Sequence, residues 1–242
     1  YDIPLRLVGS EMCIRDSVYD SVKILEYLDT LVPDQGARLY PADAKKNTEV
    51  RALVNEFSLD ERIAVGDNFG TSMAGLSTQM LAYLLCKRPL WTVIWDYLTK
   101  HPIRDRVPIF IGVRILGKPP RSKYRQFVSS AAKGIVFIEK TLSHGEAYIA
   151  GQYSAADVLL AQLFHRLEIT AFHNVLQSDQ LPFIKDYWPR LQQRASYQAG
   201  ILDFEEEEWS ECKETLYGDD ENPEIDYFWS EVKRQRNQSS KS

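Results

Sequence analysis

The sequence predicts a mainly α-helical protein, a bundle of five to seven helices packed on a small α/β piece at its N-terminal end. Three observations predict this fold class. From Asn47 onward, apolar residues recur with the period of an α-helix. The segment 154–176 opens on a strong helix-capping pattern, and no long strand pattern follows residue 40. Helices that each carry one apolar stripe are stable when those stripes pack together.

The elements before residue 44 are expected to be short. The pattern over residues 1–8 predicts a strand. Val18–Leu28 predicts the end of a strand followed by a helix, which begins at Asp20 and Ser21 because these residue types cap helix starts. Residues 31–43 contain Pro33, Gly36 and Pro41 and predict a loop.

Helical spacing accounts for most of the chain after this loop. Val50, Leu53, Val54 and Phe57 occupy positions i, i+3, i+4 and i+7 of a helix. Glycines at positions 66, 70 and 75 are expected to break or open the next helical segment. Further helices are predicted over 76–87, 89–100, 122–142, 154–176 and 182–197. The four prolines within 101–120 predict a connection that holds at most one short helix.

Composition and charge exclude several classes of protein. The chain is 44% hydrophobic, which suffices for a packed core, and its net charge of −5 gives no case for nucleic-acid binding. The segment 203–226 carries twelve acidic residues and one lysine, so the other residues sum to +6. We expect residues 203–242 to form an acidic, partly disordered tail. The aromatic residues in this tail leave open that it docks on the body or on a partner.

The cysteines indicate a reducing compartment. Neither the cysteines nor the histidines predict a metal site, and no apolar run predicts a membrane span. Three irregularly spaced cysteines predict neither a disulfide framework nor a zinc site, and cytoplasmic localisation fits best. His165 and His173 lack the neighbouring ligands of a metal set and are expected to be ordinary surface or core residues. The longest apolar run, Val107–Leu116, is shorter than the ~18 residues of a membrane span. The chain begins without methionine, which suggests a fragment.

One motif carries the family assignment. In Gly151–Leu167, Ser154 and Asp157 form an S-x-x-D capping box, and Tyr153 and Val158 occupy the positions of a hydrophobic staple. With Tyr148–Gly151 before it, this run resembles the capped, buried helix in the C-terminal domain of the glutathione transferases. These residues stabilise the fold and do not contact substrate. The alternative is an unrelated helical protein with a well-capped helix.

A second stretch supports the same resemblance. Val18–Leu28 is similar to the last strand and following helix of the family's thioredoxin-like domain, and residues 39–43 are similar to its link into the helical domain. The resemblance implies three parts: a remnant of the glutathione-binding domain (1–43), the helical domain (44–202) and the tail (203–242). It implies that Asp20 and Ser21 bind the γ-glutamyl end of glutathione. The alternative is that both residues only cap the helix.

The resemblance fails before residue 18. The family's sulfur-activating tyrosine, serine or cysteine lies in a segment that this chain lacks, so we assign no catalytic residue. Gly9–Ser17, with Leu7 and Val8, resembles a translated sequencing adaptor, and we interpret residues 7–17 as an assembly artefact. A real, shortened domain is the alternative. Cys13 follows the position of the second strand, which is the wrong place for a nucleophile.

The expected function is therefore glutathione-dependent. The intact parent would act in detoxification, conjugating glutathione to a small hydrophobic electrophile, or using it to reduce or cleave one. Phe69 and Met73, in the glycine-rich stretch, are candidate walls of the electrophile pocket, or else mark a plain kink. The resemblance implies a homodimer, and we expect no nucleic-acid or membrane partner. The first alternative is a non-catalytic interaction module. A membrane-associated relative, supported only by Val107–Leu116, is the second.

Overall fold

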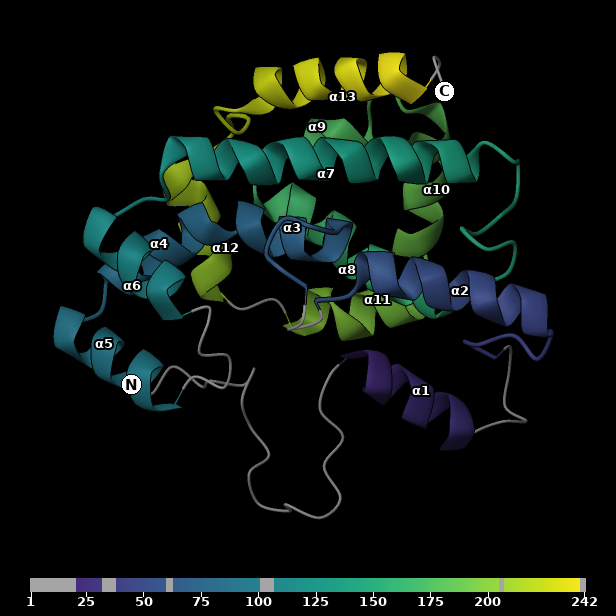
Figure 1. The fold of residues 1–242 in the computed structure, drawn as a ribbon, viewed down its shortest axis with the longest axis horizontal. Coiled ribbons are helices and arrows are strands. Elements are labelled where there is room, and N and C mark those ends of the chain that lie inside the picture. The colour runs from purple at the N-terminus through teal and green to yellow at the C-terminus, as the bar shows by residue number, and fades with distance from the viewer. Residues whose placement is uncertain (1–20, 32–37, 60–62, 101–106, 205–206, 240–242) are drawn as a thin grey trace.

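The computed structural model describes residues 21–31, 38–59, 63–100, 107–204 and 207–239, and these residues are mainly helical (Figure 1). Among them, the only β pairings are two isolated bridges, Tyr148 with Gly151 and Ala150 with Gln152. The predicted fold class is confirmed. The predicted strands lie in residues 1–20, outside the described part. The longer helices are α1 (Ser21–Leu31), α2 (Ala44–Phe57), α3 (Phe69–Leu76), α4 (Thr78–Cys86), α5 (Leu90–Lys100), α6 (Val107–Leu116), α7 (Arg121–Leu142), α8 (Ala155–Ile169), α10 (Pro182–Gln192), α12 (Glu207–Leu216) and α13 (Ile225–Ser239).

Helix α8 is the centre of the bundle, as the capping motif predicts. It packs against α2, α3 and α10, and most of its residues are buried. The capping box between Ser154 and Asp157 is present at its start. The helix ends earlier than expected, because Ala171 adopts a left-handed backbone conformation with φ of 61°. The predicted helix 154–176 is therefore two helices, α8 and the short α9 (His173–Leu176).

Helix α7 spans the molecule and separates two layers (Figure 1). Its predicted apolar face, with Phe127, Val128 and Ile135 among its members, is buried. α3 packs on one side of α7 and α13 lies along the other. Gly134 has no side chain, and this lets α7 approach α3 closely. A Cβ atom at this position would clash with the ring of Phe69.

The glycine-rich stretch forms a helix rather than a long break. Asn68 caps α3, its Oδ1 atom accepting a hydrogen bond from the Thr71 N–H at 2.9 Å. Of the three glycines, Gly66 precedes the helix with φ of +101°, whereas Gly70 and Gly75 lie inside it. A Cβ atom on Gly70 would clash with the backbone oxygen of Phe57, so this glycine permits close packing of α3 on the end of α2.

The acidic tail is folded over its described residues, 207–239. α12 packs on α4, and α13 packs on α7. Phe228 and Val232 of α13 are fully buried, as is Cys212 of α12. We expected a partly disordered tail and left open that it docks on the body. For these residues the structure shows the docked tail. The physical reason is that its scattered apolar side chains fall on the inner faces of two helices, and the acidic residues lie mostly outside.

Candidate functional site

The candidate glutathione site lies at the start of α1. Ser21 is the first described residue of α1 and is exposed, and no hydrogen bond joins its hydroxyl to another described residue. The first N–H groups of a helix have no partner inside the helix, and the helix dipole attracts negative charge there. Ser21 therefore fits a carboxylate ligand. Asp20 and Cys13 lie outside the described residues.

The other half of α1 is fixed to the bundle. Leu25 is buried in the main core, and Glu26 pairs with Arg51 of α2. The Asp29 carboxylate accepts the backbone N–H of Leu39 at 2.6 Å. These contacts line a groove of about 570 Å³ between α1 and α2. Because Glu26, Asp29 and Arg51 in this groove already have partners, we interpret the groove as a structural joint that holds α1 on the bundle.

The joint continues into the central helix. The Leu39 carbonyl accepts the N–H of Ala155, the first residue of α8, at 3.0 Å. A free N–H at the start of a buried helix is thereby satisfied by the segment that follows α1. The position of Ser21 is thus coupled to the helix on which the whole bundle is built.

Asp157 holds the start of α8 through both carboxylate oxygens. Oδ2 accepts the Ser154 N–H and the Ser154 hydroxyl, each at 2.8 Å. Oδ1 accepts the Ile149 N–H at 3.1 Å and the Tyr187 hydroxyl at 2.6 Å. Burial raises the pKa of Asp157, and the hydrogen bonds from Tyr187 and Ser154 offset only part of this effect. The carboxylate therefore has a structural role, as the capping motif predicts.

The structure places Phe69 and Met73 in the core. Their side chains are 1% and 0% exposed, and neither lines the groove between α1 and α2 or the cavity beside Tyr124. Phe69 instead packs edge-to-face on Phe57, with ring centroids 6.2 Å apart. This burial favours packing over a pocket wall, and contact with an electrophile stays a prediction.

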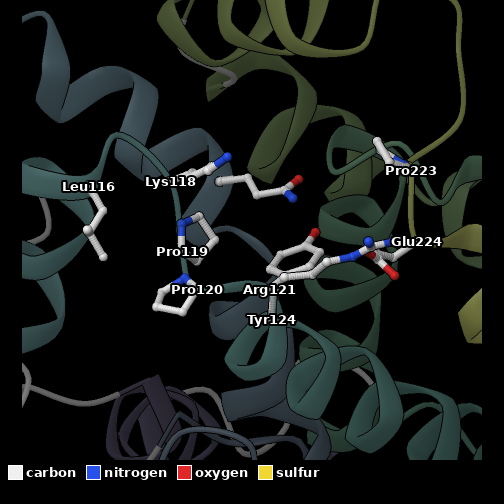
Figure 2. A pocket seen from close by; sticks show the side chains of 9 residues that line it. Leu116, Lys118, Pro119, Pro120, Arg121, Tyr124, Pro223 and Glu224 are labelled. Atoms are coloured by element: carbon white, nitrogen blue, oxygen red, sulfur yellow. The ribbon is translucent and has the colours of Figure 1, made fainter.

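A second cavity was not anticipated from the sequence. It has a volume of about 540 Å³ and lies between the α6–α7 connection, α4 and the tail (Figure 2). Figure 2 shows Tyr124 and Arg121 at its centre, Lys118 and two prolines on one side, and Pro223 and Glu224 on the other. The tail closes this cavity, so no local pattern could have revealed it before the tail was placed.

The polar groups of this cavity are mostly satisfied by one another. Asn222 donates from its amide to the Tyr124 hydroxyl at 3.0 Å, and Glu224 accepts from Arg121 at 2.5 Å and from Arg125 at 2.7 Å. Burial raises the pKa of Tyr124 well above its ordinary value. Its hydroxyl therefore stays neutral, which suits a structural role rather than proton transfer.

Burial and the hydrogen-bond partners of Glu224 shift the pKa of its carboxyl in opposite directions. Desolvation alone would raise the pKa of this carboxyl, but the hydrogen bonds and charges of Arg121 and Arg125 outweigh it. The pKa of Glu224 is therefore lowered. Glu224 is an ionised anchor that joins the tail to the first turn of α7.

Comparison with solved structures identifies the fold. A bundle built on a buried, Asp157-capped helix, and joined through Leu39 to a preceding helix with an exposed start, is the helical domain of the glutathione-transferase fold. One solved structure with this fold is the beta-etherase LigF from Sphingobium sp. strain SYK-6, which is similar to this chain with a TM-score of 0.64. The two are 19% identical, and the match covers 77% of this chain and 74% of LigF.

Comparisons with family models and with curated proteins assign the chain to no family. No family model matches the chain, and no curated protein matches it. The similarity to LigF therefore establishes the fold alone. Among the described residues, no helix is long and apolar enough to cross a bilayer.

Proposed function

We propose that this chain is part of a glutathione-dependent transferase, which conjugates glutathione to a small hydrophobic electrophile or uses it to reduce or cleave one. The observation that carries the proposal is the exposed start of α1 at Ser21, fixed to the bundle through Leu25, Asp29 and Leu39. The similarity to a beta-etherase structure supports the cleavage version of this chemistry.

The chemistry assigned to Ser21 is binding. Its hydroxyl and the first N–H groups of α1 would donate to the γ-glutamyl carboxylate, and exposed Lys23, two residues further along the chain, adds positive charge. Asp20 would meet the ammonium group of the ligand. Activation of the thiol is a separate task, and we assign it to no described residue.

Glutathione binding by the full chain tests this proposal. Titration calorimetry is expected to show binding to the wild type and about tenfold weaker binding to Ser21→Ala, because one charge-assisted hydrogen bond is lost. Ser196→Ala, an exposed serine in the first turn of another helix, is the matched control and is expected to bind normally. Unchanged affinity in Ser21→Ala would remove the site assignment. Absence of binding by the folded wild type would remove the function.

A non-catalytic interaction module is the second candidate. The observation that favours it is the exposure of Trp91 and Trp95, at 79% and 67%, on a helix at the margin of the bundle. A folded chain that binds no glutathione and forms a stable complex through this face would support the module.

Assembly and localisation are proposals of the same kind. We propose a homodimer, which light scattering coupled to gel filtration would test by its mass. A reducing compartment such as the cytoplasm suits the two described cysteines, since Cys86 is exposed and Cys212 buried and neither forms a disulfide.

A further inference from the structure

Helices α5 and α6 form a hairpin at one end of the molecule. α6 packs on α4, and α5 packs on the far side of α6 (Figure 1). The inner face of the hairpin is well packed: Val93 and Val113 are buried, and the Tyr97 and Phe110 rings stack with centroids 4.5 Å apart. The hairpin is thus anchored from one side, and its other side is available for contact.

The outer side of the hairpin is apolar. On α5, Trp91, Trp95 and Leu98 follow the i, i+4, i+7 spacing of one helix face, and they are 79%, 67% and 50% exposed. On α6, Ile115 is 63% exposed, whereas the similarly exposed Leu116 lines the cavity beside Tyr124. Single exposed apolar residues are common, but an uncovered helix face with two tryptophans indicates an interaction surface. We call the four residues Trp91, Trp95, Leu98 and Ile115 the hairpin surface.

The segments that form the hairpin carry a net positive charge. The described residues 87–100 and 107–121 hold one acid, Asp96, and six basic residues, namely Lys87, Arg88, Lys100, Arg114, Lys118 and Arg121. Two neighbouring acids, Glu211 and Glu224, pair with Lys87 and Arg121. Counting both of these acids still leaves a local charge of +3. The whole chain carries −5, so the rest of the molecule is strongly acidic.

The exposed aromatic side chains and the positive charge together indicate which kind of partner binds the hairpin surface. A symmetric contact with a second copy would bring like charges together, because both copies present the same patch. A protein partner of high affinity usually inserts or receives its central side chains in pockets. Trp91, Trp95 and Leu98 line neither of the two cavities described above. A negatively charged lipid surface needs no pocket, and tryptophan, leucine and basic residues are the types that bind it.

We propose that the hairpin surface docks the protein on anionic membranes, with Trp91, Trp95 and Leu98 at the level of the headgroups. The contact is peripheral, since no described helix could span the bilayer. It goes beyond the proposed transferase function, and it replaces the sequence-based expectation of no membrane partner. The acidic remainder of the chain would orient the hairpin toward a negative surface before contact.

Sedimentation with lipid vesicles tests the proposal. The full chain is expected to bind vesicles of phosphatidylcholine with about 30% phosphatidylserine, and to bind pure phosphatidylcholine at least about tenfold more weakly. Raising salt to about 0.5 M is expected to weaken binding to the anionic vesicles. The double variant Trp91→Ala/Trp95→Ala is expected to lose at least about tenfold in affinity for them.

The matched control is Phe204→Ala. Phe204 is 74% exposed and lies far along the chain from the hairpin, so its removal is expected to leave vesicle binding unchanged. Circular dichroism of each variant checks that the fold is kept. Equal vesicle binding by wild type and the double variant would overturn the proposal. So would a wild type that ignores anionic vesicles and forms a dimer that the double variant cannot form.

Discussion

Replacing Asp157 by alanine tests the assignment of α8 as the structural centre. The substitution removes a buried carboxylate that accepts four hydrogen bonds, from the N–H groups of Ile149 and Ser154 and from the hydroxyls of Ser154 and Tyr187. Asp157 and Ser154 are fully buried, so water cannot replace the lost acceptor. Three of these donors, both N–H groups and the Tyr187 hydroxyl, have no other acceptor nearby in the described structure.

The expected loss follows from these donors. A buried donor left without a partner costs ~1–3 kcal/mol. Three of them would cost ~3–9 kcal/mol, and the desolvation penalty that Asp157 no longer bears offsets part of this. We expect a net loss of about 4 kcal/mol. This is a large share of the 5–15 kcal/mol that stabilises an ordinary domain.

Thermal unfolding followed by circular dichroism measures this loss. At roughly 2–4 °C per kcal/mol for a chain of this size, Asp157→Ala is expected to lower the Tm by about 8–16 °C. Tyr187→Phe, which removes one of the four donors, is expected to have a smaller effect. Asp219→Ala, an exposed aspartate in the tail, is the control. A Tm for Asp157→Ala equal to that of this control would refute the reasoning.

Three further predictions concern packing and charge. Gly70→Ala is expected to destabilise the fold by more than about 2 kcal/mol, because its Cβ would clash with the backbone oxygens of Phe57 and the next residue; denaturant unfolding checks this against Gly200→Ala, where the space is open. Phe228→Ala is expected to cost ~3–5 kcal/mol and to make the tail sensitive to proteolysis; unchanged proteolysis would contradict a docked tail. Because the pKa of Glu224 is lowered on folding, its charge stabilises the fold above the ordinary value of 4.5, and this contribution is lost as pH falls below that value. Glu224→Gln is therefore expected to cost ~1–2 kcal/mol at neutral pH and nothing in acid, as unfolding at the two pH values would show.

Local patterns were reliable where the stabilising contacts are themselves local. The capping box of α8 joins Ser154 to a residue three positions later, so the sequence contains both partners. The long amphipathic helix was expected from Ser122 to Leu142 and is observed from Arg121 to Leu142, because its apolar face repeats over many turns. A helix after Asp20 and Ser21 was likewise expected from its residue types, and α1 is helical from its first described residue.

Residue patterns misled where distant contacts decide the outcome. Gly70 and Gly75 suggested a broken helix, yet their missing side chains let Phe57 and Phe127 approach. Phe69 and Met73, the candidate pocket walls, are buried between the layers on both sides of α3, and their contact with an electrophile stays a prediction. Helix propensity depends on each residue and its near neighbours in sequence. It therefore does not predict contacts with residues from another part of the chain.

By itself, the sequence determined the fold class, the capped central helix and the long amphipathic helix α7, since each depends on residues within a few turns of one another. Only the tertiary structure decided the place of the acidic tail. The tail is held by Phe228 and by ion pairs such as Glu224 with Arg125, whose partners lie 99 residues apart. Such contacts form only when the bundle brings both surfaces together, so composition predicted a solvated tail where packing produces two docked helices.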